Sequence, residues 1–347
     1  MNEKNDNNSS FSLDKNISKF DTYKGLLYMF FSCILRSLFS IFSKYILNYN
    51  YYLTSYHLLM YKVYIMSFID ILVLFYLYFF KYNKFQNINT ISPKSFIFLI
   101  IRSILSIFGQ TLTILSLKYM SISDVYSIYY LYPGFVIILT NLILKEKVEN
   151  FDYICFFFCF IGVLCVVRPN FNYLTQNNII IFLILGVLLS ALLKSFEDII
   201  IRYLRKDVYF LLFPVMYALI GLIFYPIILL IHMKEIKDEF LIEMSFYEWG
   251  IIILIAIFNF SYQALMAVSF KYENAGRADL INYFQVLFMF ISDIYLFDRN
   301  TVFYDYLGIF FIFGFNLSNG IVKSFKRNKK IQIQNNFLEE NENLIQL

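Results

Sequence analysis

The sequence is poor in charged residues. Asp, Glu, Lys and Arg make up 16% of its 347 positions, whereas a soluble domain averages about a quarter. Hydrophobic residues make up 59%, and the mean hydropathy is +0.61. They gather in runs of about 20, the length of helix that crosses about 30 Å of hydrocarbon. The composition therefore predicts an all-α polytopic membrane protein, with the lipid bilayer as its surroundings.

Residue types that enzymes depend on are also scarce. His57 and His232 are the only histidines, and neither lies in an HExxH pattern. The 11 glycines form no phosphate-cradling cluster, and there is no P-loop for ATP-driven pumping. Cys155 and Cys159 lie one helical turn apart, but no histidine or second cysteine pair completes a metal set. We therefore predict a protein that is not an enzyme, with no catalytic residues, metal, cofactor or nucleic-acid partner.

Phenylalanine and tyrosine are abundant, with 42 and 30 copies. The whole chain is also rich in Ile, Asn and Lys, so we attribute the aromatic content to a compositional bias. It gives no binding residues at this stage.

The apolar runs predict ten transmembrane helices. Prolines at 133, 214 and 226 lie inside these runs and are expected to kink their helices, which a bundle tolerates because neighbours satisfy the freed backbone groups. The predicted spans are 24–45, 53–79, 95–117, 124–144, 150–167, 179–201, 208–231, 247–270, 277–297 and 302–322.

Lys and Arg in the loops predict the orientation. With both termini included, one set of loops carries nineteen of them. The opposite set carries five, namely Lys118, Arg168, Lys234, Lys237 and Arg299. Both termini are therefore expected in the cytosol, including a disordered tail over residues 1–23.

A sequence pattern occurs twice along the chain. Glu146 precedes Gly162 by 16 residues, and Asp298 precedes Gly314 by the same 16. The pairs Lys118-Tyr119 and Lys271-Tyr272 begin the two copies, and Ser32–Ser37 aligns with Ser190–Ser195. Because each half holds five spans, the halves must lie inverted in the bilayer. We predict a five-plus-five inverted repeat over 24–168 and 179–322, with a linker at 169–178 and a cytosolic tail at 323–347.

These motifs resemble those of the drug/metabolite transporter superfamily, specifically proteins with two EamA domains, and the G-type branch of solute carrier family 35. The stretches that carry the resemblance are Arg102–Leu115, Leu117–Asp124, Tyr132–Phe135, Leu144–Lys147 and Gly162–Pro169. The second half departs from the pattern, with Gln285 or Val286 in place of a proline and Asp298 in place of a glutamate. The resemblance implies a carrier of small solutes and leaves the substrate open.

Polar residues form one-sided stripes on four predicted helices. In the first helix, Arg36 lies among serines spaced by four, and Lys194 occupies the matching place in the sixth. We predict that the stripes line a central substrate site. Its residues are Arg36, Ser40, Arg102, Ser106, Gln110, Lys194, Asp198, Asn259 and Gln263.

A structural interpretation of the same charges stays open. Arg36 and Lys194 could pair with Asp198, Glu197 or Asp70, or extend to an interface. Lys62 and Asp70 have no counterparts in the seventh helix, so we expect a structural pair there. Asp279 is left without a role, and Asp293 either caps a helix or relays protons.

The C-terminal tail holds a sorting pattern. Glu340 precedes Leu344 and Ile345 in the spacing of an acidic-dileucine signal, which would bind a sorting adaptor in the cytosol. The sequence leaves the plasma membrane, the Golgi and endolysosomal membranes open as locations, and a homodimer open as the assembly.

Taken together, the sequence predicts a secondary-active carrier of a small polar or organic solute that works by alternating access. The excess of cations in the predicted site favours an anionic or zwitterionic solute. Two alternatives remain: a nucleotide-sugar or sugar-phosphate exchanger of an organelle membrane, and a non-transporting membrane scaffold or receptor.

Overall fold

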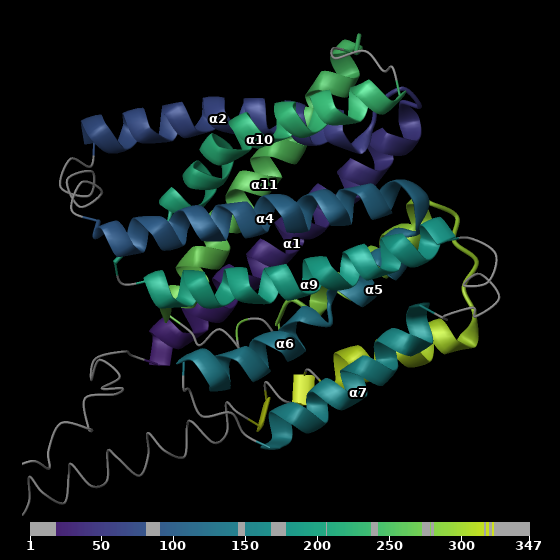
Figure 1. Cartoon of the computed structure of the whole chain (residues 1–347). Helices are drawn as coiled ribbons and strands as arrows, with labels where there is room; N and C mark the ends of the chain where they lie inside the picture. The colour runs from purple at the N-terminus through teal and green to yellow at the C-terminus, as the bar shows by residue number, and fades with distance from the viewer. Residues whose placement is uncertain are drawn as a thin grey trace, which may run out of the picture.

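A computed structural model describes residues 19–80, 91–144, 150–167, 178–205, 207–236, 242–272, 278, 281–315, 317–318 and 321–322. Its regular elements are all helices, many of them long rods lying side by side (Figure 1). They are α1 (Lys19–Tyr49), α2 (Ser55–Phe80), α4 (Pro93–Tyr119), α5 (Ile122–Tyr129), α6 (Tyr132–Leu139), the π-helical η1 (Thr140–Leu144), α7 (Asn150–Val167), α9 (Asn178–Leu204), α10 (Leu212–Ile236), α11 (Phe246–Tyr272), α13 (Phe284–Leu296) and a helix over Phe303–Phe315.

Seven of these segments are long and apolar enough to cross a membrane. One side of α2 carries exposed apolar side chains, including Phe68, Phe75 and Phe79, as expected of a surface that meets lipid. The prediction of a polytopic helical membrane protein is confirmed. Three further apolar helices, Tyr153–Gly162, Phe284–Leu296 and Phe303–Phe315, are shorter within the described residues, so the count of ten remains a prediction.

The fourth predicted span is not one helix. α5 ends at Tyr129, α6 begins at Tyr132, and the Leu131 N–H donates to the carbonyl of Ile128 at 3.1 Å, the short spacing of a turn. Pro133 accounts for the break, because it lacks an N–H and disfavours the helical conformation of the residue before it. Pro133 itself is tolerated in the first turn of α6.

The long helices pack in antiparallel pairs. α1 lies against α11, with Ser269 donating to the Gly25 carbonyl near one end and Asn50 donating to Glu248 near the other. α4 also runs antiparallel to α9. Ser116 donates to the Leu183 carbonyl near one end of the pair, and Arg102 forms an ion pair with Glu197 near the other.

Two glycines that belong to the repeated pattern differ in their surroundings. A Cβ on Gly162 of α7 would lie 2.6 Å from the carbonyl oxygen of Gly308, so this glycine permits close packing of α7 on the helix over Phe303–Phe315. A Cβ on Gly314 would meet nothing within 4 Å.

Candidate functional site

Gln110 lies at the centre of a buried polar network. Its Oε1 accepts hydrogen bonds from Lys62 Nζ at 2.8 Å, from the Tyr217 hydroxyl at 2.8 Å and from Asn259 Nδ2 at 3.2 Å. Its Nε2 donates to the hydroxyl of Tyr262 at 2.8 Å. One amide therefore joins α2, α4, α10 and α11 in the interior of the bundle.

Asn259 extends the network toward α9. Its Oδ1 accepts from Gln263 Nε2 at 2.6 Å, and Gln263 Oε1 accepts from Arg102 Nη2 at 3.0 Å. Arg102 is fully buried, donates to the carbonyl of Phe213 at 2.9 Å and forms an ion pair with Glu197. The Arg102 charge thus has a carboxylate partner.

Lys194 is also paired with acids. Its Nζ lies 2.6 Å from Asp198 Oδ1 and 3.6 Å from Glu197 Oε2, all three side chains being buried. It also lies 3.4 Å from the sulfur of Met266 on α11. The pairing of Lys194 with Asp198, one of the alternatives from the sequence, is therefore observed.

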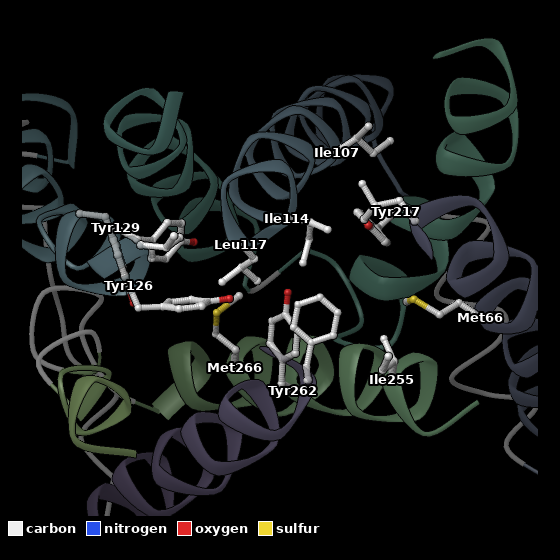
Figure 2. Packing of buried hydrophobic residues seen from close by; sticks show 14 of the residues in the cluster. Met66, Ile107, Ile114, Leu117, Tyr126, Tyr129, Tyr217, Ile255, Tyr262 and Met266 are labelled. Atoms are coloured by element: carbon white, nitrogen blue, oxygen red, sulfur yellow. The ribbon is translucent and has the colours of Figure 1, made fainter. Parts of the chain in front are cut away.

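Arg36 has tyrosine partners where Lys194 has acids. It donates through Nη2 to the hydroxyl of Tyr129, and its guanidinium carbon lies 4.9 Å from the centre of the Tyr129 ring and 5.4 Å from that of Tyr262. Within the described residues no carboxylate pairs with Arg36, and its buried Nη1 has no hydrogen-bond partner. Figure 2 shows Tyr126 and Tyr129 on one helix and Tyr262 on another.

The tyrosines beside Arg36 gather at the break between α5 and α6. Their rings contact one another, with centroids 5.4 Å apart for Tyr129 and Tyr132 and 6.2 Å apart for Tyr130 and Tyr283 of the second half. All are buried. They are absent from the predicted site, because tyrosine is abundant along the whole chain and its content alone marks no site. The clustering of four tyrosines within residues 126–132, next to Pro133, was the available signal.

The predicted site residues thus form two neighbouring groups. Ser40 joins the Arg36 group through a hydrogen bond with the Tyr126 hydroxyl, and Ser106 is buried one turn from Gln110 on α4. Tyr262 connects the groups, because its hydroxyl binds Gln110 while its ring faces Arg36. The network around Gln110 holds Arg102, Lys194, Asp198, Asn259 and Gln263.

The predicted pairing of Lys62 with Asp70 is wrong. Lys62 donates to Gln110 and to the Tyr217 hydroxyl, both at 2.8 Å, while the buried carboxylate of Asp70 has no partner within the described part of the chain. Eight residues along a helix correspond to about 12 Å, so acceptors on neighbouring helices are nearer to the ammonium group.

Asp293 caps a helix, which is one of the two roles predicted for it. Its carboxylate accepts from the Ser123 N–H at 2.7 Å and from the Ile122 N–H at 3.3 Å, at the start of α5. Several predicted features lie outside the described residues. They are Glu146, Arg168, Asp279, Glu340, Leu344 and Ile345.

Comparison with known proteins finds relatives whose names refer to transport. A "Probable transport protein YPL264C" of Saccharomyces cerevisiae is 28% identical over 57% of this chain and 60% of its own length. "Solute carrier family 35 member G1" of Homo sapiens is 25% identical over 71% of this chain and 68% of its own. The "Pseudopaline exporter CntI" of Pseudomonas aeruginosa is 21% identical over 55% of this chain and 63% of its own. The match to the yeast protein thus spans about 60% of that relative's length.

Two further matches concern the fold and the family. A protein of known crystal structure superposes with a TM-score of 0.59, over 87% of this chain and 96% of the other, at 10% identity, which shows the fold alone. The sequence profile of the EamA-like transporter family matches residues 23–168 and again residues 181–315. The chain therefore belongs to the EamA-like transporter family, within the drug/metabolite transporter superfamily.

Proposed function

We propose that the protein is a secondary-active carrier that moves a small organic solute, anionic or zwitterionic, by alternating access. The observation that carries the proposal is the polar network around Gln110, which places buried cations, acids and amides in the interior of the bundle. Ionisable groups in hydrocarbon are costly, so their concentration in the interior is typical of a transport pathway.

The network joins the two matched regions of the chain. Gln110 and Gln263 occupy equivalent positions, since the same offset relates Lys118 to Lys271. Asn259 bridges them, donating to Gln110 and accepting from Gln263. A solute bound here would contact both halves, as alternating access between two repeats requires.

The direction of the helices supports inverted halves. α2 and α10 run antiparallel, because Tyr56 lies beside His232 and Val63 beside Gly221. α1 and α4 each run antiparallel to a partner from the second half. We therefore propose ten membrane-spanning helices in a five-plus-five inverted repeat, with both termini in the cytosol.

Uptake into proteoliposomes tests the function. Purified protein would be reconstituted and screened with labelled organic anions, amino acids and nucleotide sugars, with and without the same solute inside. We expect saturable uptake of at least one solute, accelerated by exchange or by an ion gradient. Empty liposomes and protein with Gln263→Leu, which breaks the network, are the controls.

A scaffold or receptor gives the opposite result. If no solute enters in a saturable way and none stabilises the protein against heat, the carrier proposal fails. If nucleotide sugars alone are exchanged, the exchanger of an organelle membrane takes its place.

A further inference from the structure

We propose that Arg36 and the tyrosines around it bind the solute directly, and that the solute is a small carboxylate with a planar or aromatic body. This inference rests on the proposed function and names its substrate class. The site lies between α1, the α5–α6 break, α11 and Tyr283, which directly precedes α13.

The charges of the interior single out Arg36. Arg102 and Lys194 are neutralised by Glu197 and Asp198, so a solute anion could bind either cation only by displacing a buried carboxylate. Arg36 faces aromatic rings and one hydroxyl. A buried cation that forms no ion pair with a carboxylate favours the arrival of an anion.

Unused hydrogen-bonding groups lie in the same region. Arg36 has five N–H donors, and its Nη1 has no partner although the side chain is 93% buried. The hydroxyl of Tyr130 is buried and also without a partner in the described structure, and so are both amide atoms of Gln285, two residues after the Tyr283 that contacts Tyr130. Native interiors leave few such groups, so together they indicate a site that a polar ligand completes.

Lys62 is another buried cation, and its surroundings differ from those of Arg36. Two neutral acceptors, Gln110 and Tyr217, already take hydrogen bonds from its Nζ. The rings of Phe39 and Tyr262 contact each other, with centroids 6.1 Å apart. Lys62 lies over the Phe39 ring, whereas Arg36 lies over the Tyr262 ring. Lys62 therefore belongs to the network around Gln110, and Arg36 retains the free donors.

The tyrosines indicate the chemistry of the part of the ligand that lies beyond its carboxylate. Tyr130 and Tyr283 occupy equivalent positions in the two halves and their rings lie 6.2 Å apart, so the site is at the junction of the halves. Rings of Tyr129 and Tyr132 complete an aromatic wall. Aromatic walls favour a planar or apolar body, and one unpaired cation matches one carboxylate better than a doubly charged phosphate.

Binding of benzoate, benzyl alcohol, benzylamine and inorganic phosphate to the full-length protein in detergent tests this site. We expect benzoate to raise the melting temperature in a saturable way and the other three to do so weakly or not at all. Arg36→Gln should weaken benzoate binding tenfold or more, Arg36→Lys less, and Tyr130→Phe several-fold. Arg202→Gln is the matched control, because it changes a buried arginine that donates to a backbone carbonyl, and benzoate binding should persist.

Equal stabilisation by benzylamine or benzyl alcohol would overturn the proposal, as would wild-type benzoate affinity in folded Arg36→Gln protein. If Arg36→Gln does not fold, benzoate binding by Arg36→Lys and Tyr130→Phe tests the site, and wild-type affinity in both would overturn the proposal. Uptake in the proteoliposome screen with unchanged benzoate binding in these variants would reject the site and leave the carrier intact. Benzoate binding at Arg36 without transport of any solute would reject the carrier and leave the site.

Discussion

Lys44 and Arg202 make the same contact in the two halves of the chain. Lys44 on α1 donates to the carbonyl oxygen of Leu117 near the end of α4, and Arg202 on α9 donates to that of Phe270 near the end of α11 at 2.6 Å. Leu117 and Phe270 each precede a Lys-Tyr pair. Carbonyls at a helix C-terminus lack partners within the helix, and a cation there also complements the helix dipole.

Removing either cation should therefore destabilise the bundle. For Arg202→Met we expect a loss of about 1–3 kcal/mol, the cost of leaving a buried acceptor unpaired. Thermal unfolding in detergent measures it, with Arg202→Lys as the conservative control that retains a donor. Equal melting temperatures for wild type and Arg202→Met would show that the contact contributes nothing.

Gly162 and Gly314 provide a matched pair for a packing test. Gly162→Ala places a methyl group against the Gly308 carbonyl and the side chain of Ile312, and should destabilise by about 1–3 kcal/mol through overpacking. Gly314→Ala adds the same methyl group in open space and should leave the melting temperature unchanged or raise it. If both variants melt alike, the close approach of α7 to the helix over Phe303–Phe315 is not tight.

Much of the fold follows from the sequence because a membrane helix shows itself by length and apolar composition alone. α2, α4 and α11 begin and end within two residues of the predicted spans. The break at Tyr130 lies three residues before a proline that was predicted to kink its helix, so only the extent of the distortion was missing.

The partners of the charges could not be predicted in the same way. Gln110 takes its bonds from residues 48, 107, 149 and 152 positions away, and no local pattern specifies which helices meet. Repeat symmetry made Arg36 and Lys194 equivalent, yet one faces tyrosines and the other faces acids. The difference arises because Asp198 has the small residue Ser40 as its counterpart.

The orientation of the loops in the membrane can be tested separately. A cysteine would be introduced at position 85 or at position 240 of a protein whose own four cysteines are replaced. In sealed vesicles an impermeant thiol reagent should label position 85 from the cytosolic side and position 240 from the opposite side. The nineteen-to-five distribution of loop cations is the physical reason. Labelling of both positions from the cytosol would contradict the inverted arrangement.

Arg299 joins the two halves at one end of the bundle. Its guanidinium lies 3.0 Å from Asp124 at the start of α5 and 3.5 Å from Asp293 at the end of α13, and it donates to Ser121 at 3.2 Å. If the halves rock apart here, these contacts must break. We expect Arg299→Gln to raise the rate at which a cysteine at position 121 is labelled from the non-cytosolic side, about tenfold for a loss of about 1.4 kcal/mol.

A conservative substitution is the control for that experiment. Arg299→Lys retains a positive charge beside Asp124, Asp293 and Asp305 and should keep the labelling rate close to that of the protein with Arg299. A rate unchanged by Arg299→Gln would mean that the contact does not hold this end closed.

The ion pair between Lys194 and Asp198 predicts a rescue. Lys194→Gln leaves the fully buried Asp198 carboxylate without its 2.6 Å partner, and breaking a buried pair from one side costs about 3–5 kcal/mol. Asp198→Asn in the same chain removes the stranded charge while keeping a side chain of the same size. The double variant should therefore melt well above Lys194→Gln and close to the wild type. Glu197 lies 3.6 Å from Lys194 but has Arg102 as its nearer partner, so Glu197→Gln with Lys194→Gln should rescue less. Equal rescue by Asp198→Asn and by Glu197→Gln would mean that Lys194 interacts equally with both acids, and would contradict a specific pair with Asp198.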